Sequence, residues 1–569
     1  LLLFWEVPFE ELGKKWRFCA KGGDYSWFLT NINTVLNWNF DGRIIAEYTA
    51  TVSSNVAQAR RSSKYYFLPA LTCTYRCTDF SLRALPSGCV FTSGARVIIP
   101  HNESDAVPLL SSFFSEDYAG FLRQIEKKGK YEPGPLGSLP SPVIASNDKL
   151  LHAWEELYSL LLSFESNLET SPYFSGIPSL ELPDPDAAEF RRRVVAFAEA
   201  SEYAKSEDFV EKAVKSICSR YSIENASHRV VSFCIGRCFG RFGEPIGLPE
   251  CDPFTDLATL MPSLRQSHRF RGATALEHDA RKGVSSPMCR MVRSQFEVLA
   301  EGTGVSGSDW ELKQLGDQGL ESYLSKAYGF FAQHIKDYSA AFRKAPIYWQ
   351  LGTPSSSYSI WIYYHDFTRD TLFQVLKEYA GPKLNHERKM LDRARSEAGA
   401  DPTRSQRKDI EEQERFVTEL AAMIEEFERV APLWDPNLND GVIINFAPLW
   451  RLVPQNRSWQ KECKSSWDKL VVGDCDWTHL AMHLWPERVV PKCVADASLA
   501  MSHGLEDVFW EQDERGRFQP KQEPPGGWDP VIKELVAERT SPAVKAALES
   551  LLTAPVAASP GRTRKRRGT

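Results

Sequence analysis

The chain has 569 residues, of which 43% are hydrophobic and 25% are charged, and this balance is that of an ordinary globular protein. Its length allows about three to four domains. The formal net charge of −6 excludes a uniformly basic nucleic-acid-binding protein but is compatible with a local basic face.

Residues 14–145 are predicted to form a small mixed α/β domain. They follow a short segment, 1–13, which has the composition of a linker or of the end of an upstream domain. Short apolar runs broken by Gly, Pro, Asn and Ser predict strands, and apolar residues at helical spacing predict one helix. The predicted strands are 35–40, 44–45, 89–91 and 96–100, and the predicted helix is 113–127. A Pro-, Gly- and Ser-rich stretch, 132–146, then predicts a linker.

The chain beyond this linker is predicted to be a large, mostly helical module with a Trp-rich, compact C-terminal region, so the whole is expected to be an α+β protein. Apolar residues at helical spacing from Leu150 to Phe164 predict a helix over 149–169. Charges of both signs along 377–431 predict a solvated helical hairpin, and 360–365 is strongly β-prone. The expected divisions are a helical region 146–260, an irregular or diverged connector 261–320, an α+β module 321–510 and a helical tail 511–569 with a disordered basic end.

The segment 21–25, Lys-Gly-Gly-Asp-Tyr, combines paired glycines with charge and an aromatic ring. Glycine lets the backbone adopt positive φ and approach another surface closely. Lysine and arginine neutralise phosphates or read guanine edges, and aromatic rings stack on bases. The same residue types return at 64–72, which indicates one DNA-binding surface, although a plain aromatic core is the alternative. The candidate DNA-binding residues are Lys21, Gly22, Gly23, Asp24, Tyr25, Trp27, Arg43, Lys64, Tyr65, Tyr66, Thr72, Arg76 and Arg83.

Several blocks of sequence, in their order along the chain, resemble the adenine-specific DNA methyltransferases of bacterial BREX phage-exclusion systems, the PglX family. The matching blocks are the KGGDY segment 21–25, the YYF-x-P-x-LT segment 65–72, the KYE-x-G segment 130–134, and the blocks 232–242, 344–349 and 440–450. The resemblance implies that 14–145 is a target-recognition domain. Ala70 and Cys73 depart from the family's Gly-Leu-Thr-Trp pattern, which indicates another target sequence or drift.

The resemblance also implies an activity for the full-length protein, the transfer of a methyl group from S-adenosylmethionine to adenine N6 in a short non-palindromic DNA site. Such transfer needs an Asn/Asp-Pro-Pro-Tyr/Phe segment that holds the flipped base, and the sequence contains none. We therefore expect the catalytic domain upstream of Leu1, with no catalytic residue and no cofactor site in this chain. The expected partners are double-stranded DNA and other proteins of the phage-defence system.

Two other classes of function stay open on the sequence. A DNA- or protein-binding scaffold would use the helical module as a docking surface for partners. A metal-dependent nuclease would need clustered carboxylates and a lysine around a divalent cation, and Glu462-Cys463-Lys464 is a fragment of that kind. Such triplets arise often by chance, so the scaffold is the stronger of the two alternatives.

Further motifs have structural interpretations. The G-x-G-x-x-G run 302–307 lacks a preceding strand, so we predict a linker between helices instead of a cofactor loop. The segment 435–441 resembles a calcium loop but places Phe446 where a bidentate glutamate is needed, so a turn rich in Asx residues is expected. His479 and His483 are spaced i, i+4 without an evident third ligand, which favours packing over metal binding.

Cysteine usage and hydropathy indicate a cytoplasmic protein. Twelve cysteines in so long a chain are not a disulfide framework, and the pairs Cys73/Cys77 and Cys234/Cys238 lack zinc-knuckle spacing. We expect them to be reduced thiols. No apolar run is long enough to span a bilayer.

Overall fold

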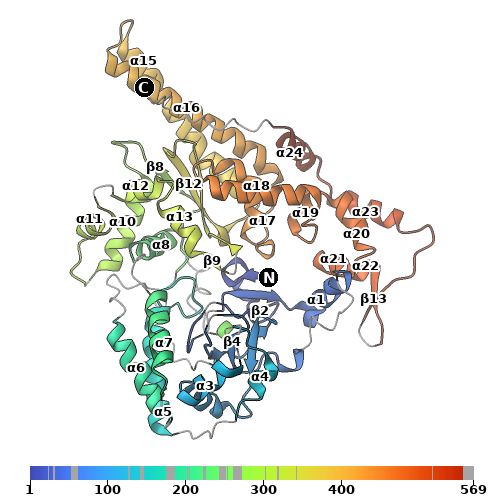
Figure 1. Ribbon diagram of the computed structural model, residues 1–569. Coiled ribbons are helices and arrows are strands. Elements are labelled where there is room, and N and C mark those ends of the chain that lie inside the picture. The colour runs from blue at the N-terminus through green and yellow to red at the C-terminus, as the bar shows by residue number, and fades with distance from the viewer. Residues whose placement is uncertain are drawn as a thin grey trace, which may run out of the picture. The chain divides into compact units, whose positions relative to one another are not determined.

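The computed structural model describes residues 1–569 with the exception of 24, 30–31, 53–61, 78, 126–128, 141–146, 175–185, 202, 204, 222–225, 243–251, 253, 260–271, 302, 317–318, 341–342, 515–516 and 555–569 (Figure 1). The described chain is 58% helix and 12% strand, which confirms the predicted α+β class. Two compact units are present, one formed by 1–366 with 441–443 and the other by 367–440 with 444–569. The stretch 321–510, predicted as one module, therefore contributes to both units.

The first unit begins with two small sheets in the region predicted to recognise DNA. A four-stranded sheet has the order β1-β3-β2-β6, and a three-stranded antiparallel sheet has the order β5-β4-β7. The strands are β1 (Leu2–Leu3), β2 (Trp16–Ala20), β3 (Thr34–Asn37), β4 (Ala70–Thr74), β5 (Arg83–Leu85), β6 (Val90–Phe91) and β7 (Ala95–Ile98). The predicted strand at 89–91 is confirmed over 90–91, and those at 96–100 and 35–40 are each confirmed over their first three residues.

The predicted strand at 44–45 is wrong, because these residues lie in helix α1 (Asn39–Val52). Within these bounds Phe40, Asp41 and Gly42 have left-handed φ values of 52°, 54° and 74°, so a kink lies in the first turn of the helix. Ile45 then packs beside Trp38 in a small cluster with Cys19 and Val90. The β-branched isoleucines favour a strand locally, and tertiary packing overrides this preference here.

Five helices follow and complete one aromatic core with the two sheets. They are α2 (Ala106–Ser112), α3 (Glu116–Ile125), α5 (Asp148–Glu165), α6 (Ala187–Glu199) and α7 (Glu207–Arg220). The ring of Trp27 lies 4.3 Å from that of Phe114 and 5.6 Å from that of Phe209, between centroids. Phe28 packs on Phe114 at 5.2 Å and on Phe197 at 5.7 Å. The recognition region and the helices after the predicted linker therefore share their core.

The rest of the first unit is built on a three-stranded antiparallel sheet, β11-β12-β8. Its strands are β8 (Leu276–Asp279), β11 (Tyr348–Gly352) and β12 (Tyr358–Tyr363), and its helices include α8 (Ala226–Cys238), α10 (Pro287–Ala300), α11 (Gly307–Leu315), α12 (Gly319–Ser325) and α13 (Phe330–Asp337). The β-prone run at 360–365 is thus confirmed over its first four residues. Of the G-x-G-x-x-G run, residue 302 lies outside the described part, and 303–307 lead from α10 into α11, as predicted for a linker between helices.

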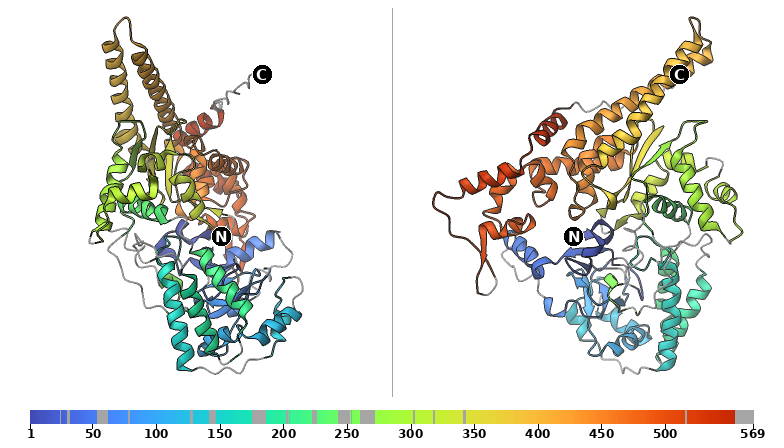
Figure 2. Two further views of the ribbon diagram at one scale, coloured as in Figure 1. Left: turned by 60° about the vertical axis from the view of Figure 1, so that its left-hand side comes forward. Right: turned by 180° about the vertical axis from the view of Figure 1, so that it is seen from behind.

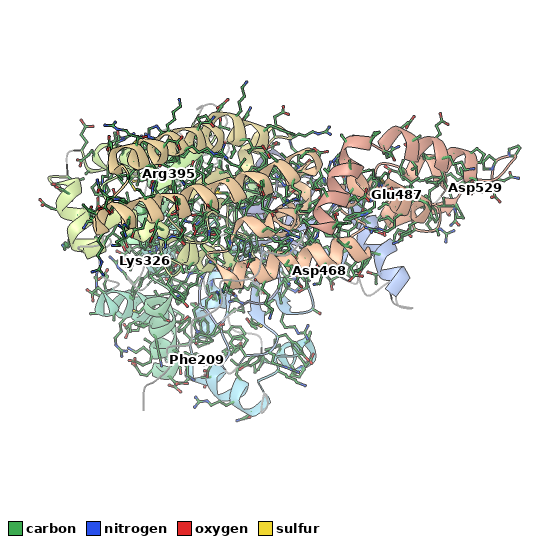
Figure 3. The ribbon with its side chains drawn as sticks, turned by 90° about the horizontal axis from the view of Figure 1, so that it is seen from above. Phe209, Lys326, Arg395, Asp468, Glu487 and Asp529 are labelled. Carbon is green, nitrogen blue, oxygen red and sulfur yellow. The ribbon has the colours of Figure 1, made fainter. Side chains whose placement is uncertain are left out.

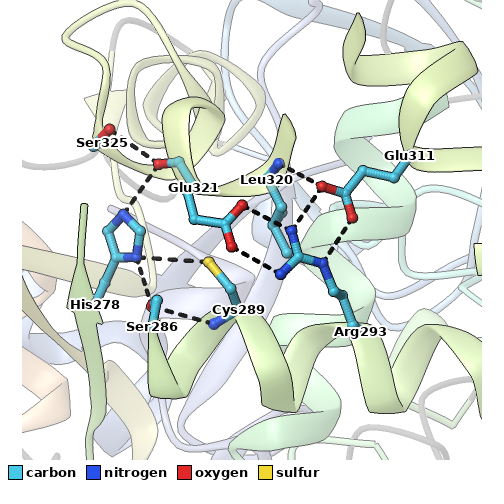
Figure 4. A network of polar contacts seen from close by, with 8 residues as sticks. All are labelled: His278, Ser286, Cys289, Arg293, Glu311, Leu320, Glu321 and Ser325. Carbon is cyan, nitrogen blue, oxygen red and sulfur yellow. Dashed lines mark hydrogen bonds and ion pairs between the residues drawn. The ribbon is translucent and has the colours of Figure 1, made fainter. Parts of the chain in front are cut away.

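The irregular connector predicted over 261–320 is wrong for its second half, while residues 261–271 lie outside the described part. β8 and α10 fold there, and α10 has a buried apolar face that includes Val292 and Phe296. A polar network also holds the two elements (Figure 4). His278 Nε2 lies 3.1 Å from the carbonyl oxygen of Glu321, and His278 Nδ1 lies 2.9 Å from Ser286 Oγ. Arg293 donates to the carboxylates of both Glu311 and Glu321 at 2.7–2.8 Å.

The second unit is almost entirely helical. Figures 1 and 2 show the predicted helical hairpin, α15 (Gly381–Ala398) and α16 (Arg404–Val430), as two antiparallel helices. Arg395, labelled in Figure 3, pairs with Glu414 across the hairpin at 2.7 Å. The other elements include α18 (Arg457–Val472), α19 (His479–Leu484), α20 (Pro486–Cys493), α21 (Ala497–Ser502), α22 (Glu506–Phe509), the β13–β14 hairpin (Trp510–Gln512, Phe518–Pro520), α23 (Asp529–Arg539) and α24 (Pro542–Thr553).

Several tryptophans of the C-terminal half are core residues, whereas Trp477 is 47% exposed. Trp434 and Trp459 are 1% exposed in the second unit, and Trp349 and Trp361 are fully buried in the first. The indole N–H of Trp434 donates to the carbonyl oxygen of Asn445 at 2.9 Å. The basic end, 562–567, lies outside the described residues. None of the described helices is long and apolar enough to cross a membrane.

Candidate nucleic-acid interface

A cleft of about 1400 Å³ in the first unit is the candidate site. Its walls are the end of β2 with the loop 21–26, the strands β4 and β5, helix α7, and the hairpin β9–β10 (Ser339–Ala340, Arg343–Lys344). Asp79 is the only acidic side chain among the lining residues that the structure describes. The basic lining residues are Lys21, Arg83, Lys212, Lys215, Arg220, Arg343 and Lys344.

Ion pairs neutralise some of these charges and leave others open to solvent. Lys212 contacts Asp79 at 2.6 Å. Arg220 contacts Glu165 at 2.5 Å, and Arg343 contacts Glu6 at 2.6 Å. Lys21 and Lys215 are exposed and form no ion pair with a described residue. These two ammonium groups are the ones available to an anionic ligand without loss of an internal contact.

Arg83 holds the loop that carries Lys21. Its side chain is buried, at 2% exposure, and donates to Ser26 Oγ at 3.1 Å and to Thr74 Oγ1 at 2.8 Å. The Thr74 hydroxyl donates in turn to the carbonyl oxygen of Gly22 at 2.9 Å. Because these bonds commit both terminal nitrogens of the guanidinium, the interpretation of Arg83 as a phosphate contact is corrected to a positioning role. A buried arginine of this kind cannot be distinguished from an exposed one by sequence.

The paired glycines are required by the fold itself. Gly22 has a φ of 96°, and a Cβ there would lie 2.3 Å from the carbonyl oxygen of Gly94. Gly23 has a φ of 68°. The expected positive φ and close approach are both present, and the surface that the loop approaches is the chain's own turn before β7.

Tyr25 and Trp27 were both predicted to stack on bases, but they differ in burial and only Tyr25 lines the cleft. Trp27 is 2% exposed and its indole N–H donates to Tyr25 Oη at 2.6 Å. The prediction for Trp27 is therefore wrong, since the ring is part of the aromatic core. Tyr25 is half-buried and lines the cleft, and burial raises the pKa of its phenol.

The cleft gathers only part of the predicted set. Lys21, Gly22, Gly23, Tyr25, Thr72 and Arg83 line it, and Asp24 lies outside the described residues. Thr72 is buried and its hydroxyl donates to the carbonyl oxygen of Arg96 at 2.9 Å. The predicted residues that do not line the cleft are Trp27, Arg43, Lys64, Tyr65, Tyr66 and Arg76.

The second predicted group fails to join the site because its rings pack locally. Tyr66 lies edge-on to Trp38 at 5.5 Å and to Phe91 at 4.9 Å. Lys64 and Tyr65 are exposed on a short turn, where the ammonium lies 4.6 Å from the Tyr65 ring. For the basic and aromatic residues 64–66, the similarity to the first segment therefore reflects composition and not a shared surface, and only Thr72 of this segment lines the cleft.

Sequence reasoning missed the contribution of α7. Lys212, Lys215, Ser216 and Ser219 all line the cleft, and their spacing places them on one face of the helix. Basic and hydroxyl side chains that recur at helical spacing over 212–219 are the sequence signal that could have indicated this contribution. Lys344, also in the lining, lies in a block that the family resemblance had included.

The other candidate centres have structural roles. His479 Nε2 lies 3.1 Å from Asp435 Oδ2, and Asp440 accepts the backbone N–H groups of His479 and Leu480 at 2.8 and 2.9 Å, capping α19. Asn437 Oδ1 accepts the N–H of Asn439, which confirms the predicted Asx turn. Within the described ranges, no group of three or more His, Cys, Asp or Glu side chains could hold a metal ion.

The triplet proposed for a nuclease lies on α18. Lys464 there contacts Asp468, one turn later on the same helix, at 2.7 Å. This is a surface ion pair of the kind common on exposed helices. The chain matches no protein-family model and no curated protein.

Proposed function

We propose that the basic cleft binds DNA and that this chain is the DNA-recognition and C-terminal portion of a site-specific adenine-N6 DNA methyltransferase of a BREX phage-defence system. The observation that carries the proposal is the cleft itself. Exposed Lys21 and Lys215 line it from separate segments, and Asp79 is the single acidic residue in its described lining. Methyl transfer from S-adenosylmethionine would belong to a domain outside this chain. Other proteins of the defence system would be further partners.

The chemistry of the cleft suits a sugar–phosphate backbone. Phosphate contacts come mainly from lysine, arginine, hydroxyl side chains and backbone N–H groups, and they position a protein on DNA without reading its sequence. The lining supplies Lys21, Lys215, Ser219 and the glycine loop at 22–23. A net charge of −6 for the chain makes this local concentration of positive charge more distinctive.

The first test is salt-dependent binding of a labelled DNA duplex by the whole chain, measured by fluorescence anisotropy. Binding should weaken linearly in log–log form as salt rises, with a slope of about −0.9 for each phosphate neutralised. Lys21→Ala should lower affinity and reduce the magnitude of that slope by about 1. Lys64→Ala is the matched control, because Lys64 is exposed in the same region but does not line the cleft.

Two outcomes would reject this proposal. One is the absence of duplex binding by the unmodified chain at low salt. The other is an equal loss of affinity in Lys21→Ala and Lys64→Ala, which would move the binding surface away from the cleft.

The methyltransferase assignment has a separate test. The coding DNA upstream of the Leu1 codon should encode an Asn-Pro-Pro segment followed by an aromatic residue, in a domain that binds S-adenosylmethionine. DNA binding without such an upstream segment would favour the alternative of a DNA- or protein-binding scaffold, which needs no catalytic domain.

A further inference from the structure

Helix α7 forms a wall of the cleft, although it follows the predicted recognition domain by more than sixty residues of sequence. The side chains that it presents recur at one-turn spacing along a single face. They are Lys212, Lys215, Ser216, Ser219 and Arg220. The opposite side of α7 packs inward through Phe209, Val210, Ala213, Val214 and Ile217.

Contacts of three kinds hold α7 against the recognition region at Tyr25, Trp27 and Asp79. Ser216 Oγ donates to the carbonyl oxygen of Tyr25 at 3.0 Å. Lys212 pairs with Asp79 at 2.6 Å, and the ring of Phe209 lies 5.6 Å from that of Trp27. The helix is therefore fixed at the loop by a hydrogen bond to Tyr25 and an aromatic contact with Trp27, and at the segment between β4 and β5 by the ion pair with Asp79.

These contacts divide the cleft face of α7 into anchoring and available side chains. Lys212 and Ser216 are the anchors, and Arg220 is paired with Glu165. Lys215 and Ser219, one turn apart, are exposed and form no ion pair or side-chain bond with the described residues. An ammonium and a hydroxyl at this spacing can donate to oxygens of one phosphate or of two adjacent phosphates.

We infer that α7 forms part of the DNA site. Lys215 and Ser219 donate to the sugar–phosphate backbone, and Lys21 contacts it from the loop 21–26. The inference rests on the proposed DNA-binding function and adds a helix that the resemblance to a recognition domain does not include. The ligand feature bound by α7 is the phosphodiester, so α7 contributes affinity to every sequence equally.

The experiment measures affinity of the whole chain for duplexes of unrelated sequence at several salt concentrations. Lys215→Ala should weaken binding roughly ten-fold near 50 mM salt and reduce the salt slope by about 1, equally for all duplexes. Lys215→Glu should weaken it further, Lys215→Arg should retain most of it, and Ser219→Ala should cause a smaller loss. Lys149→Ala on α5 is the matched control, since Lys149 is an exposed helical lysine that does not line the cleft.

The outcomes separate this inference from the function on which it rests. If Lys21→Ala weakens binding and Lys215→Ala does not, the cleft binds DNA and α7 is no part of the site. If Lys215→Ala affects one sequence only, α7 reads bases and the backbone assignment is wrong. If the unmodified chain binds no duplex, both fail. Equal thermal unfolding midpoints for Lys215→Ala and Lys149→Ala exclude misfolding as the cause of lost binding.

Discussion

Arg83 illustrates how the same side chain can be necessary to a binding site without touching the ligand. Its guanidinium reaches Ser26 and Thr74 from a position with 2% exposure. Through Thr74 it fixes the carbonyl of Gly22, and so the loop on which Lys21 is exposed. Removing the arginine leaves the hydroxyl oxygens of Ser26 and Thr74 without this donor, which costs more than the loss of an exposed hydrogen bond.

We predict that Arg83→Met lowers the stability of the first unit by about 2–4 kcal/mol, because a buried charged hydrogen-bond network is broken. Chemical denaturation followed by tryptophan fluorescence measures this, since Trp27 lies close to the network. Arg76→Met is the control, because Arg76 is exposed and should change stability by no more than about 0.5 kcal/mol. Equal effects of the two substitutions would contradict the positioning role.

At the scale of elements, β8 and α10 show how buried polar contacts join elements that also pack through apolar residues. His278 is fully buried, and burial lowers its pKa from 6.5 to about 4. Its ring nitrogens contact Ser286 at the start of α10 and the backbone of Glu321 in α12. One side chain thus joins a strand to two helices (Figure 4).

The buried imidazole predicts acid sensitivity. The unfolded chain takes up a proton near pH 6.5 while folded His278 does so near pH 4, so stability is fully present above 6.5 and is lost as pH falls between these values. The full loss from this group is about 3 kcal/mol. His228, whose pKa burial lowers to about 3, acts in the same direction.

Thermal unfolding between pH 7 and pH 5 tests this prediction. His278→Gln should show a smaller fall in midpoint over that range than the unmodified chain, because glutamine does not titrate. His152→Gln is the control, since His152 is exposed on α5 and should leave the pH dependence unchanged. Parallel curves for His278→Gln and the unmodified chain would count against a neutral buried imidazole.

At the scale of the whole molecule, the recognition region 14–145 has no hydrophobic core separate from that of helices α5 to α7. Trp27 and Phe28 pack against Phe209, Phe197 and Trp154, which come from α7, α6 and α5. The linker predicted at 132–146 therefore separates segments of sequence that fold together. Both the cleft and the core beneath it need residues from each side of that linker.

We predict that a fragment of residues 1–145 does not fold cooperatively, because its central aromatic rings lose their helical partners. Exposure of rings of this size costs about 3–5 kcal/mol each. Tryptophan emission of the fragment should be red-shifted, and its thermal melt should lack a sharp transition. A fragment of residues 1–221, which restores α5 to α7, should recover much of the blue-shifted emission. A cooperative melt of 1–145 would contradict the shared core.

Much of the local structure was determined by the sequence alone. Three local patterns each predicted the element found there. They are apolar residues at helical spacing from Leu150 to Phe164, mixed charge along 377–431, and β-branched and aromatic residues at 360–363. These signals work because backbone propensity and amphipathic spacing act within a few turns of chain. The need for glycine at 22 and 23 was also readable, because positive φ is rarely open to other residues.

The composition of the candidate site was decided only by the tertiary structure. Sequence types could not separate buried Arg83 and Trp27 from exposed Lys21, or place Lys215 beside a loop almost two hundred residues earlier. Burial and proximity arise from contacts between distant segments, and no local pattern encodes which segments will meet. The packing of α7 on the loop 21–26 therefore decides which basic residues line one cleft.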